Sequence, residues 1–241
     1  MDEAAPTPSP ALARTEDPPV PLTEHLAELR RRLIVSLISI AAGAVVLFHW
    51  SGGLLELVAK PAGRLYFTAP RDAFMIRVML SLFGGLILAL PVVLLQIWGF
   101  VARALDQGWR APLRLMVAAS YVLFLGGAGL AYFVVLPAAM RFLRAYGSQS
   151  VQPLMAVDSY VGFAAALCVA FGAVFQLPLA LIILNKAGIV SREFLKSKRS
   201  YAYVLAFLVG AFLTPGPDVF SQVALAIPTL VLFEITLLVL K

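Results

Sequence analysis

Charged residues are scarce in this chain. Asp, Glu, Lys and Arg make up only 13% of its 241 residues, whereas 61% are hydrophobic. So few polar side chains cannot cover the surface of a soluble globule of this size. The shortage therefore excludes a soluble globular domain and indicates an all-α membrane protein that crosses the bilayer several times.

Cysteine and histidine are almost absent. Cys168 is the single cysteine and lies in an apolar run, so the chain can form neither an internal disulfide nor a cysteine metal site. His25 and His49 are predicted on opposite sides of the membrane, and no H-E-x-x-H motif occurs. Ser148 and Ser150 lack the sequence context of a catalytic nucleophile. We therefore expect no enzyme activity, no metal and no other cofactor.

The N-terminal segment has no apolar core. Residues 1–20 are rich in Pro and Ala, which excludes a cleavable signal peptide and predicts a disordered cytoplasmic tail. Residues 21–241 are predicted to form a single six-helix transmembrane domain. Each apolar run is interpreted as a helix, because an open strand cannot cross lipid. The six runs are 33–49, 75–101, 115–137, 159–184, 201–213 and 219–240.

The last two runs are predicted to be short. Residues 201–213 give about 20 Å of helix at 1.5 Å per residue, against a hydrocarbon core of about 30 Å. Gln222, Pro228 and Glu234 interrupt the sixth run. Either a thinned bilayer or a re-entrant hairpin would accommodate this pair.

Basic residues predict the orientation of the chain. Thirteen Lys and Arg fall on the side of the N-terminus and six on the other side. The positive-inside rule then places both termini in the cytoplasm, with Trp50 and Trp98 as interfacial anchors. The net charge of +6 is explained by these flanking residues and by anionic lipid, so nucleic acid is not expected as a partner.

A carboxylate precedes the first apolar run. Residues 21–33 are predicted to form a polar helix whose leucines, at 22, 26, 29 and 33, share one face. That face can lie against an apolar surface while Glu24, Glu28 and the arginines face water or a ligand. The simplest role for Glu28 is an i,i+4 pair with Arg32. Alternatively, it could receive a cation at the membrane surface.

Small and polar residues inside the apolar runs indicate close helix contacts. Gly84, Gly85, Gly126, Gly127 and Gly129 are interpreted as packing positions, as is the row formed by residues 168, 172 and 176. Gln176 should face the protein interior or a wet cavity, because an unpaired amide is costly in lipid. An interhelical hydrogen bond and a functional polar site are both open for it.

Three motifs in order resemble the TatC family, the multi-spanning receptor component of the twin-arginine protein translocase. They are HLAELRRRL at 25–33, FGAVFQLP at 171–178 and FLTPGPDVFSQVALAIP at 212–228. The resemblance implies a bacterial-type cytoplasmic (inner) membrane protein with both ends cytoplasmic. It also implies binding of twin-arginine signal peptides of folded cargo, export driven by the proton-motive force, and a place within a larger complex that can include further copies of the chain.

The resemblance assigns signal-peptide recognition to a Glu-Leu-Arg motif and to an acidic residue of the first cytoplasmic loop. Glu28, Leu29 and Arg30 match the first. The loop glutamate of the family falls on Trp109, and Asp106 is the only carboxylate in that loop. The guanidinium of a signal arginine can bind a carboxylate through two bonds or stack on an aromatic ring. The family's fourth-span position is often Glu and is Gln176 here.

The resemblance also implies partner subunits. Small single-span subunits of the TatA and TatB type contact the fifth and sixth spans in the family, where Thr214 and Gln222 match a polar cluster and Ser221 lies beside them. A bond between Thr214 and Gln222 within the chain is the alternative.

The residues alone are also compatible with two other functions. A secondary transporter would use Gln176, Gln222 and Asp218 around a polar cavity, although no internal repeat is visible. A structural assembly factor would bind partner helices without handling substrate.

Overall fold

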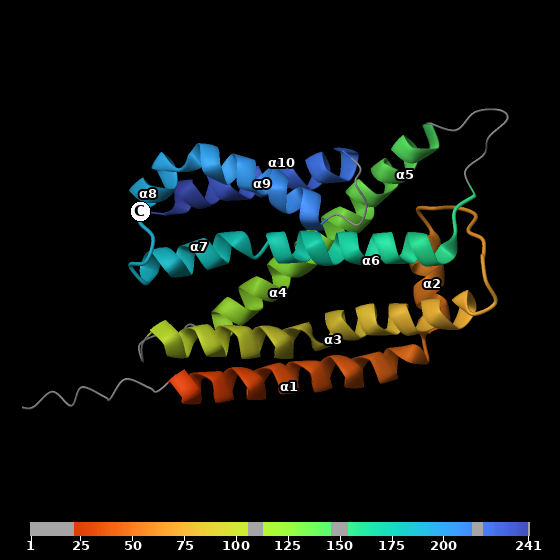
Figure 1. Cartoon of the computed structure of the whole chain (residues 1–241), viewed down its shortest axis with the longest axis horizontal. Helices are drawn as coiled ribbons and strands as arrows, with labels where there is room; N and C mark the ends of the chain where they lie inside the picture. Colours follow the sequence, from red (N-terminus) through yellow and green to blue (C-terminus); the bar gives the residue numbers. More distant parts are fainter. Residues whose placement is uncertain (1–21, 106–112, 146–153, 214–218, 241) are drawn as a thin grey trace, which may run out of the picture.

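The chain forms a bundle of long helices, seen in a computed structural model that describes residues 22–105, 113–145, 154–213 and 219–240 (Figure 1). The predicted tail, residues 1–20, lies outside these ranges. The helices are α1 (Leu22–Phe48), α2 (Ser51–Ala59), α3 (Asp72–Leu105), α4 (Leu113–Leu130), η2 (Ala131–Val135), α5 (Leu136–Ala145), α6 (Val157–Val174), α7 (Leu177–Lys186), α8 (Arg192–Ser197), α9 (Arg199–Leu213) and α10 (Val219–Val239).

The described residues contain five apolar helical segments long enough to cross a membrane and one shorter apolar helix, α9. This confirms the all-helical polytopic prediction and the short fifth run. The sixth run is not short, because α10 continues through Pro228 for 21 residues and is long enough to span. The predicted polar helix at 21–33 is also not separate, since it continues into the first span as α1.

The third span passes through a π-helical turn, η2, between α4 and α5. The Leu136 amide donates to the Ala131 carbonyl, five residues earlier. Pro137 follows at once, and a proline ring clashes with the carbonyl four residues before it. The wider turn relieves that clash without ending the span, which runs over 33 residues.

The fourth span breaks at Gln176. Helix α6 ends at Val174 and α7 begins at Leu177, with Pro178 in its first turn. The two pieces lie in line (Figure 1), so the break changes the direction of the chain little. The break leaves Phe175 and Gln176 between the two helices, outside regular α-helix.

Two close helix contacts confirm part of the glycine prediction. A Cβ on Gly85 would lie 2.4 Å from the Ala44 amide nitrogen, so α1 and α3 meet backbone to backbone. A Cβ on Gly127 would lie 2.6 Å from the Phe171 carbonyl oxygen, where α4 crosses α6. Gly126, by contrast, has open space at its Cβ position, so it is not a packing glycine.

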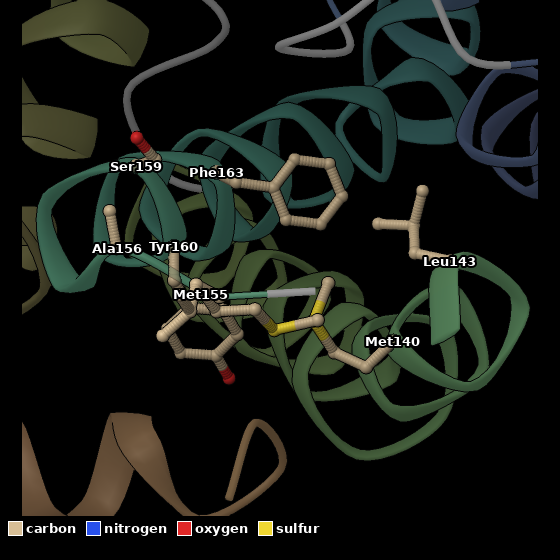
Figure 2. Close-up of a pocket in the computed structure, with 8 residues that line it drawn as sticks. Met140, Leu143, Met155, Ala156, Ser159, Tyr160 and Phe163 are labelled. Atoms are coloured by element: carbon tan, nitrogen blue, oxygen red, sulfur yellow. The ribbon is translucent and has the colours of Figure 1, made fainter. Parts of the chain in front are cut away.

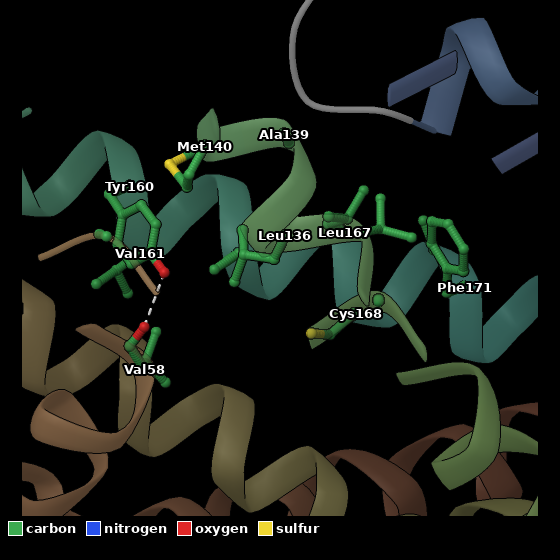
Figure 3. Close-up of a cluster of buried hydrophobic side chains, with 14 of the residues drawn as sticks. Val58, Leu136, Ala139, Met140, Tyr160, Val161, Leu167, Cys168 and Phe171 are labelled. Atoms are coloured by element: carbon green, nitrogen blue, oxygen red, sulfur yellow. Dashed lines mark hydrogen bonds between the residues drawn. The ribbon is translucent and has the colours of Figure 1, made fainter. Parts of the chain in front are cut away.

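The main core lies around α6, where it meets α2, α3, η2 and α5 (Figure 3). Leu136, Val161, Leu167 and Phe171 are fully buried there. The Tyr160 hydroxyl donates to the Val58 carbonyl at 2.9 Å and ties α2 to this core. Trp98 is also buried, with 6% of its surface exposed, so its predicted role as an interfacial anchor is wrong.

The start of α1, the end of α3, α8 and the end of α10 lie at one end of the bundle (Figure 1). We call this the α1 end. Helix α2, the end of α5 and the start of α6 lie at the opposite end.

Candidate functional site

Glu28 lies at the α1 end, in the seam between α1 and α3. Its Oε1 accepts from the Arg32 Nε at 2.7 Å and lies 2.7 Å from Arg32 Nη2. The same oxygen is 3.1 Å from Nη1 of Arg103, in the last turn of α3. The i,i+4 pair that the sequence allowed is therefore present, and a second arginine joins it. Among the described residues these contacts involve Oε1, so Oε2 keeps its acceptor capacity for a further donor.

Arg32 is a fixed part of this seam. Its Nη1 donates to the Gln96 carbonyl at 2.9 Å and lies 3.5 Å from Gln96 Oε1. The guanidinium rests on Gly99, where a Cβ would be 2.4 Å from Nη1. Gln96, Gly99 and Arg103 follow one another at helical spacing on α3, which gives α1 a polar strip to pack against. Arg32 thus holds Glu28 in place and joins the two helices.

A cavity of about 470 Å³ opens beside Glu28. Its lining residues come from both helices: Ala27, Glu28, Arg31, Arg32, Val35, Gln96 and Arg103. The Glu28 side chain keeps 17% of its surface exposed here, so a ligand can reach it. Three arginines and one carboxylate make the lining positive, and an arginine ligand must therefore compete with the cations of the chain itself.

The other predicted recognition residues divide into two groups. Leu29 is exposed and lies on the face of α1 that carries Leu26 and Leu33. Arg30 lines a neighbouring hollow on α1, which shares Ala27, Arg31 and Val35 with the Glu28 cavity. The structure therefore does not bring Leu29 or Arg30 into the Glu28 cavity. Asp106 and Trp109 lie outside the described residues.

The leucine face of α1 points away from the protein. Leu26, Leu29 and Leu33 are 63%, 45% and 57% exposed. The sequence predicted that this face lies against an apolar surface, while Glu24, Glu28 and the arginines face water or a ligand. In a membrane the apolar face can meet lipid, whereas Glu28 and Arg32 turn toward α3 and Arg30 and Arg31 are exposed.

Gln176 belongs to a closed hydrogen-bond network. Its Oε1 accepts from the Ser120 hydroxyl at 2.6 Å, and its Nε2 donates to the Ser120 carbonyl at 3.1 Å. The Ser120 hydroxyl in turn accepts from Trp98 Nε1 at 2.7 Å. The network joins α3, α4 and the break between α6 and α7, which is the interhelical bond that the sequence left open.

Two of the three predicted docking residues, Ser221 and Gln222, lie at the start of α10. Gln222 Nε2 donates to the Phe207 carbonyl at 3.0 Å and so ties α10 to α9. Ser221 is buried. Thr214 lies outside the described residues, as does Asp218, so the predicted bond between Thr214 and Gln222 stays a prediction.

A second carboxylate with charged and polar partners, Glu234, lies between α9 and α10, and the sequence assigned no role to these contacts. Glu234 Oε2 accepts from Arg199 Nη2 at 2.6 Å, and Oε1 accepts from the Tyr203 hydroxyl at 2.6 Å. Arg103 and Gln96 were missed as well. Gln96 is an amide inside an apolar run, which was the available signal for it.

A second cavity, of about 290 Å³, lies at the opposite end of the bundle (Figure 2). The side chains of Met140, from α5, and Met155, from the chain before α6, meet there, and Tyr160 and Phe163 of α6 also line the cavity. Its lining carries no charged side chain. In the part of the chain that the structure describes, no cluster of three or more His, Cys, Asp or Glu side chains could hold a metal ion.

Comparison with known proteins identifies the family. The family model for TatC, the Sec-independent protein translocase protein, matches residues 24–228. The chain is 37% identical over 230 residues to the Sec-independent protein translocase protein TatC of Carboxydothermus hydrogenoformans, covering 94% of this chain and 95% of that one. The TatC of Escherichia coli K12 is 39% identical over 222 residues, covering 89% and 86%.

A solved structure agrees with these matches. The crystal structure of the twin arginine translocase receptor TatC in DDM superposes with a TM-score of 0.80 at 38% identity. The match covers 90% of this chain and 99% of that chain.

Proposed function

The chain belongs to the TatC family, as the receptor subunit of the twin-arginine translocase, and from this premise we propose that Glu28 binds an arginine of the signal peptide. It is a transport protein and not an enzyme. The observation that supports Glu28 is its place in the lining of a hollow of peptide side-chain size, where its side chain keeps part of its surface exposed while Arg32 holds its Oε1. A guanidinium can donate two hydrogen bonds to a carboxylate, and such charge-assisted bonds are the strong ones.

Binding of a labelled peptide tests this proposal. The peptide carries the paired arginines, and a second peptide with paired lysines is the specificity control. Glu28→Gln keeps the size of the side chain and removes its charge, so affinity for the arginine peptide should fall about tenfold or more. Glu24→Gln is the matched control, because Glu24 is exposed one turn earlier on the same helix.

The result that would overturn the site is unchanged affinity in Glu28→Gln. Correct folding of each variant is checked with a thiol-reactive fluorophore, because Cys168 is buried and becomes labelled only when the bundle opens. If Asp106 supplies a second carboxylate, Asp106→Asn should also weaken binding, and its effect should be less than additive with that of Glu28→Gln. If Trp109 stacks on the second arginine instead, Trp109→Ala should give that loss.

We infer that small single-span subunits dock at the start of α10. Gln222 supports this inference, because its amide nitrogen is engaged with Phe207 while its side-chain carbonyl can accept from a partner helix. The Thr214→Val, Gln222→Leu double variant should keep peptide binding but lose co-purification of the small subunit and lose export. Co-purification at normal stoichiometry would place the partner on another face.

We propose that the α1 end lies in the cytoplasm and that the opposite end faces the periplasm. The thirteen-to-six distribution of Lys and Arg supports this orientation. The start of α1 and the end of α10 lie at the same end of the bundle, as expected for a chain with an even number of spans. A reporter fused after Ser197 should behave as cytoplasmic and one fused after Lys60 as periplasmic. A cytoplasmic result at Lys60 would reverse the assignment.

A further inference from the structure

Two arginines contact Glu28, and they are held very differently. Arg32 is 15% exposed and makes bonds to both Glu28 and Gln96. Arg103 is 64% exposed, and its single ion pair within the described residues is the 3.1 Å contact to Glu28. Exposed ion pairs of this kind contribute little, because water screens them and the long side chain loses freedom. Arg103 is therefore the exchangeable partner of Glu28.

The position of Arg103 also matters for the charge of the cavity. Arg31, Arg32 and Arg103 line it together with a single carboxylate. A peptide guanidinium that arrives at Glu28 meets repulsion from all three arginines. Arg31 and Arg32 lie on α1 with Glu28, whereas Arg103 reaches across from the last turn of α3. Only Arg103 combines high exposure with direct contact, so it alone can swing away at small cost.

We propose that Arg103 is an internal competitor for the signal arginine: its guanidinium occupies the cavity side of Glu28 and gives way when a peptide guanidinium binds. This inference rests on the proposed function of Glu28. It adds a residue that sets the affinity of this site. A peptide must offer a better donor than Arg103 to displace it, and a bidentate arginine does so where a lysine, with a single point charge, does not.

Removing the competitor should strengthen binding. In Arg103→Gln, affinity for the arginine peptide should rise about two- to fivefold, the range that corresponds to losing one exposed ion pair. Affinity for the lysine peptide should rise by at least the same factor, so discrimination between the two peptides should not improve. Arg114→Gln is the matched control, since Arg114 is an exposed arginine at the start of α4 and makes no ion pair with Glu28.

The double variant separates this proposal from the one it rests on. In the Glu28→Gln background, Arg103→Gln should leave affinity unchanged, because the contact that it releases no longer exists. Weaker binding in Arg103→Gln alone would make Arg103 a contributor and overturn the inference. An equal gain in affinity in Arg114→Gln would show that the effect comes from the net charge of the protein, and it would overturn the inference too. If Glu28→Gln has no effect by itself, the proposed site fails, whatever Arg103 does.

Discussion

Glu28 and Glu234 are two carboxylates at the same end of the bundle, and each is paired with an arginine. They differ in how many of their oxygens are used by partners within the described chain. Glu234 uses both oxygens, one for Arg199 and one for Tyr203. Glu28 receives two arginines on one oxygen, and its side chain lines a cavity. Glu234 is nevertheless the more exposed, at 33% against 17% for Glu28. Exposure alone therefore does not distinguish a binding carboxylate from a structural one.

The difference follows from where the partners come from. Tyr203 and Arg199 are one turn apart on α9, so they present two donors side by side to a carboxylate on α10. Arg32 lies on the same helix as Glu28 and approaches it along α1. Its guanidinium then reaches α3, so one flank of Glu28 stays open to the cavity. A fully satisfied carboxylate acts as a clamp, and one with spare acceptor capacity can accept a ligand.

The largest expected effect comes from separating α1 from α3, because the Glu28 cavity exists only where they meet. Gly85→Ala places a Cβ 2.4 Å from the Ala44 nitrogen, on backbone that cannot move without parting the helices. We expect a loss of about 3 kcal/mol in stability and a clear loss of peptide binding. The measurement is the temperature at which Cys168 becomes reactive to a thiol probe, together with peptide affinity.

Gly126→Ala is the control for that change. Its Cβ would enter open space, so stability should stay within about 1 kcal/mol of the original protein and binding should be unaffected. Equal damage from both substitutions would show that the α1 to α3 seam has no special part in the site.

The second effect concerns the closed network around Gln176. Gln176→Leu removes its bonds to Ser120 at membrane depth, and we expect a loss of about 2 kcal/mol, since interhelical hydrogen bonds contribute roughly 0.6–2 kcal/mol each. Peptide affinity should not change, because this network does not touch the Glu28 cavity. Reduced affinity with unchanged stability would instead make Gln176 a functional polar group.

Apolar runs located the helices well. The six predicted runs match the spans to within a few residues at most ends, because only long helices satisfy the backbone in lipid. The run at 115–137 was too short, since the third span continues through η2 and α5 to Ala145. Polar residues of α5, such as Arg141, ended the hydropathy signal before the helix itself ended.

Periodicity found the two faces of α1 but not what each face contacts. The periodicity predicted that the leucines meet an apolar surface, and the exposed Leu26 shows that this surface is not another part of the described chain. The prediction that Trp98 is an interfacial anchor was wrong, because the Ser120 hydroxyl, 22 residues away, accepts a hydrogen bond from the Trp98 ring nitrogen inside the bundle. Glu28 itself was found from its motif. Arg103 was not, because its contact depends on how α3 lies against α1.

The smallest effect tests the comparison most directly. Glu234→Gln keeps an acceptor for one donor and loses the charge that serves both Arg199 and Tyr203. The cluster is partly exposed, so we expect a stability loss of only about 1 kcal/mol, read from the thermal exposure of Cys168. Peptide affinity should stay within about twofold, which is less than one exposed ion pair can change. Glu28→Gln should give the opposite pattern, with a large loss of affinity and a small change in stability, because Arg32 keeps its bonds to Gln96. If Glu234→Gln weakened peptide binding as strongly as Glu28→Gln, spare acceptor capacity would not be what separates the two carboxylates, and the α9 to α10 clamp would itself belong to the recognition surface.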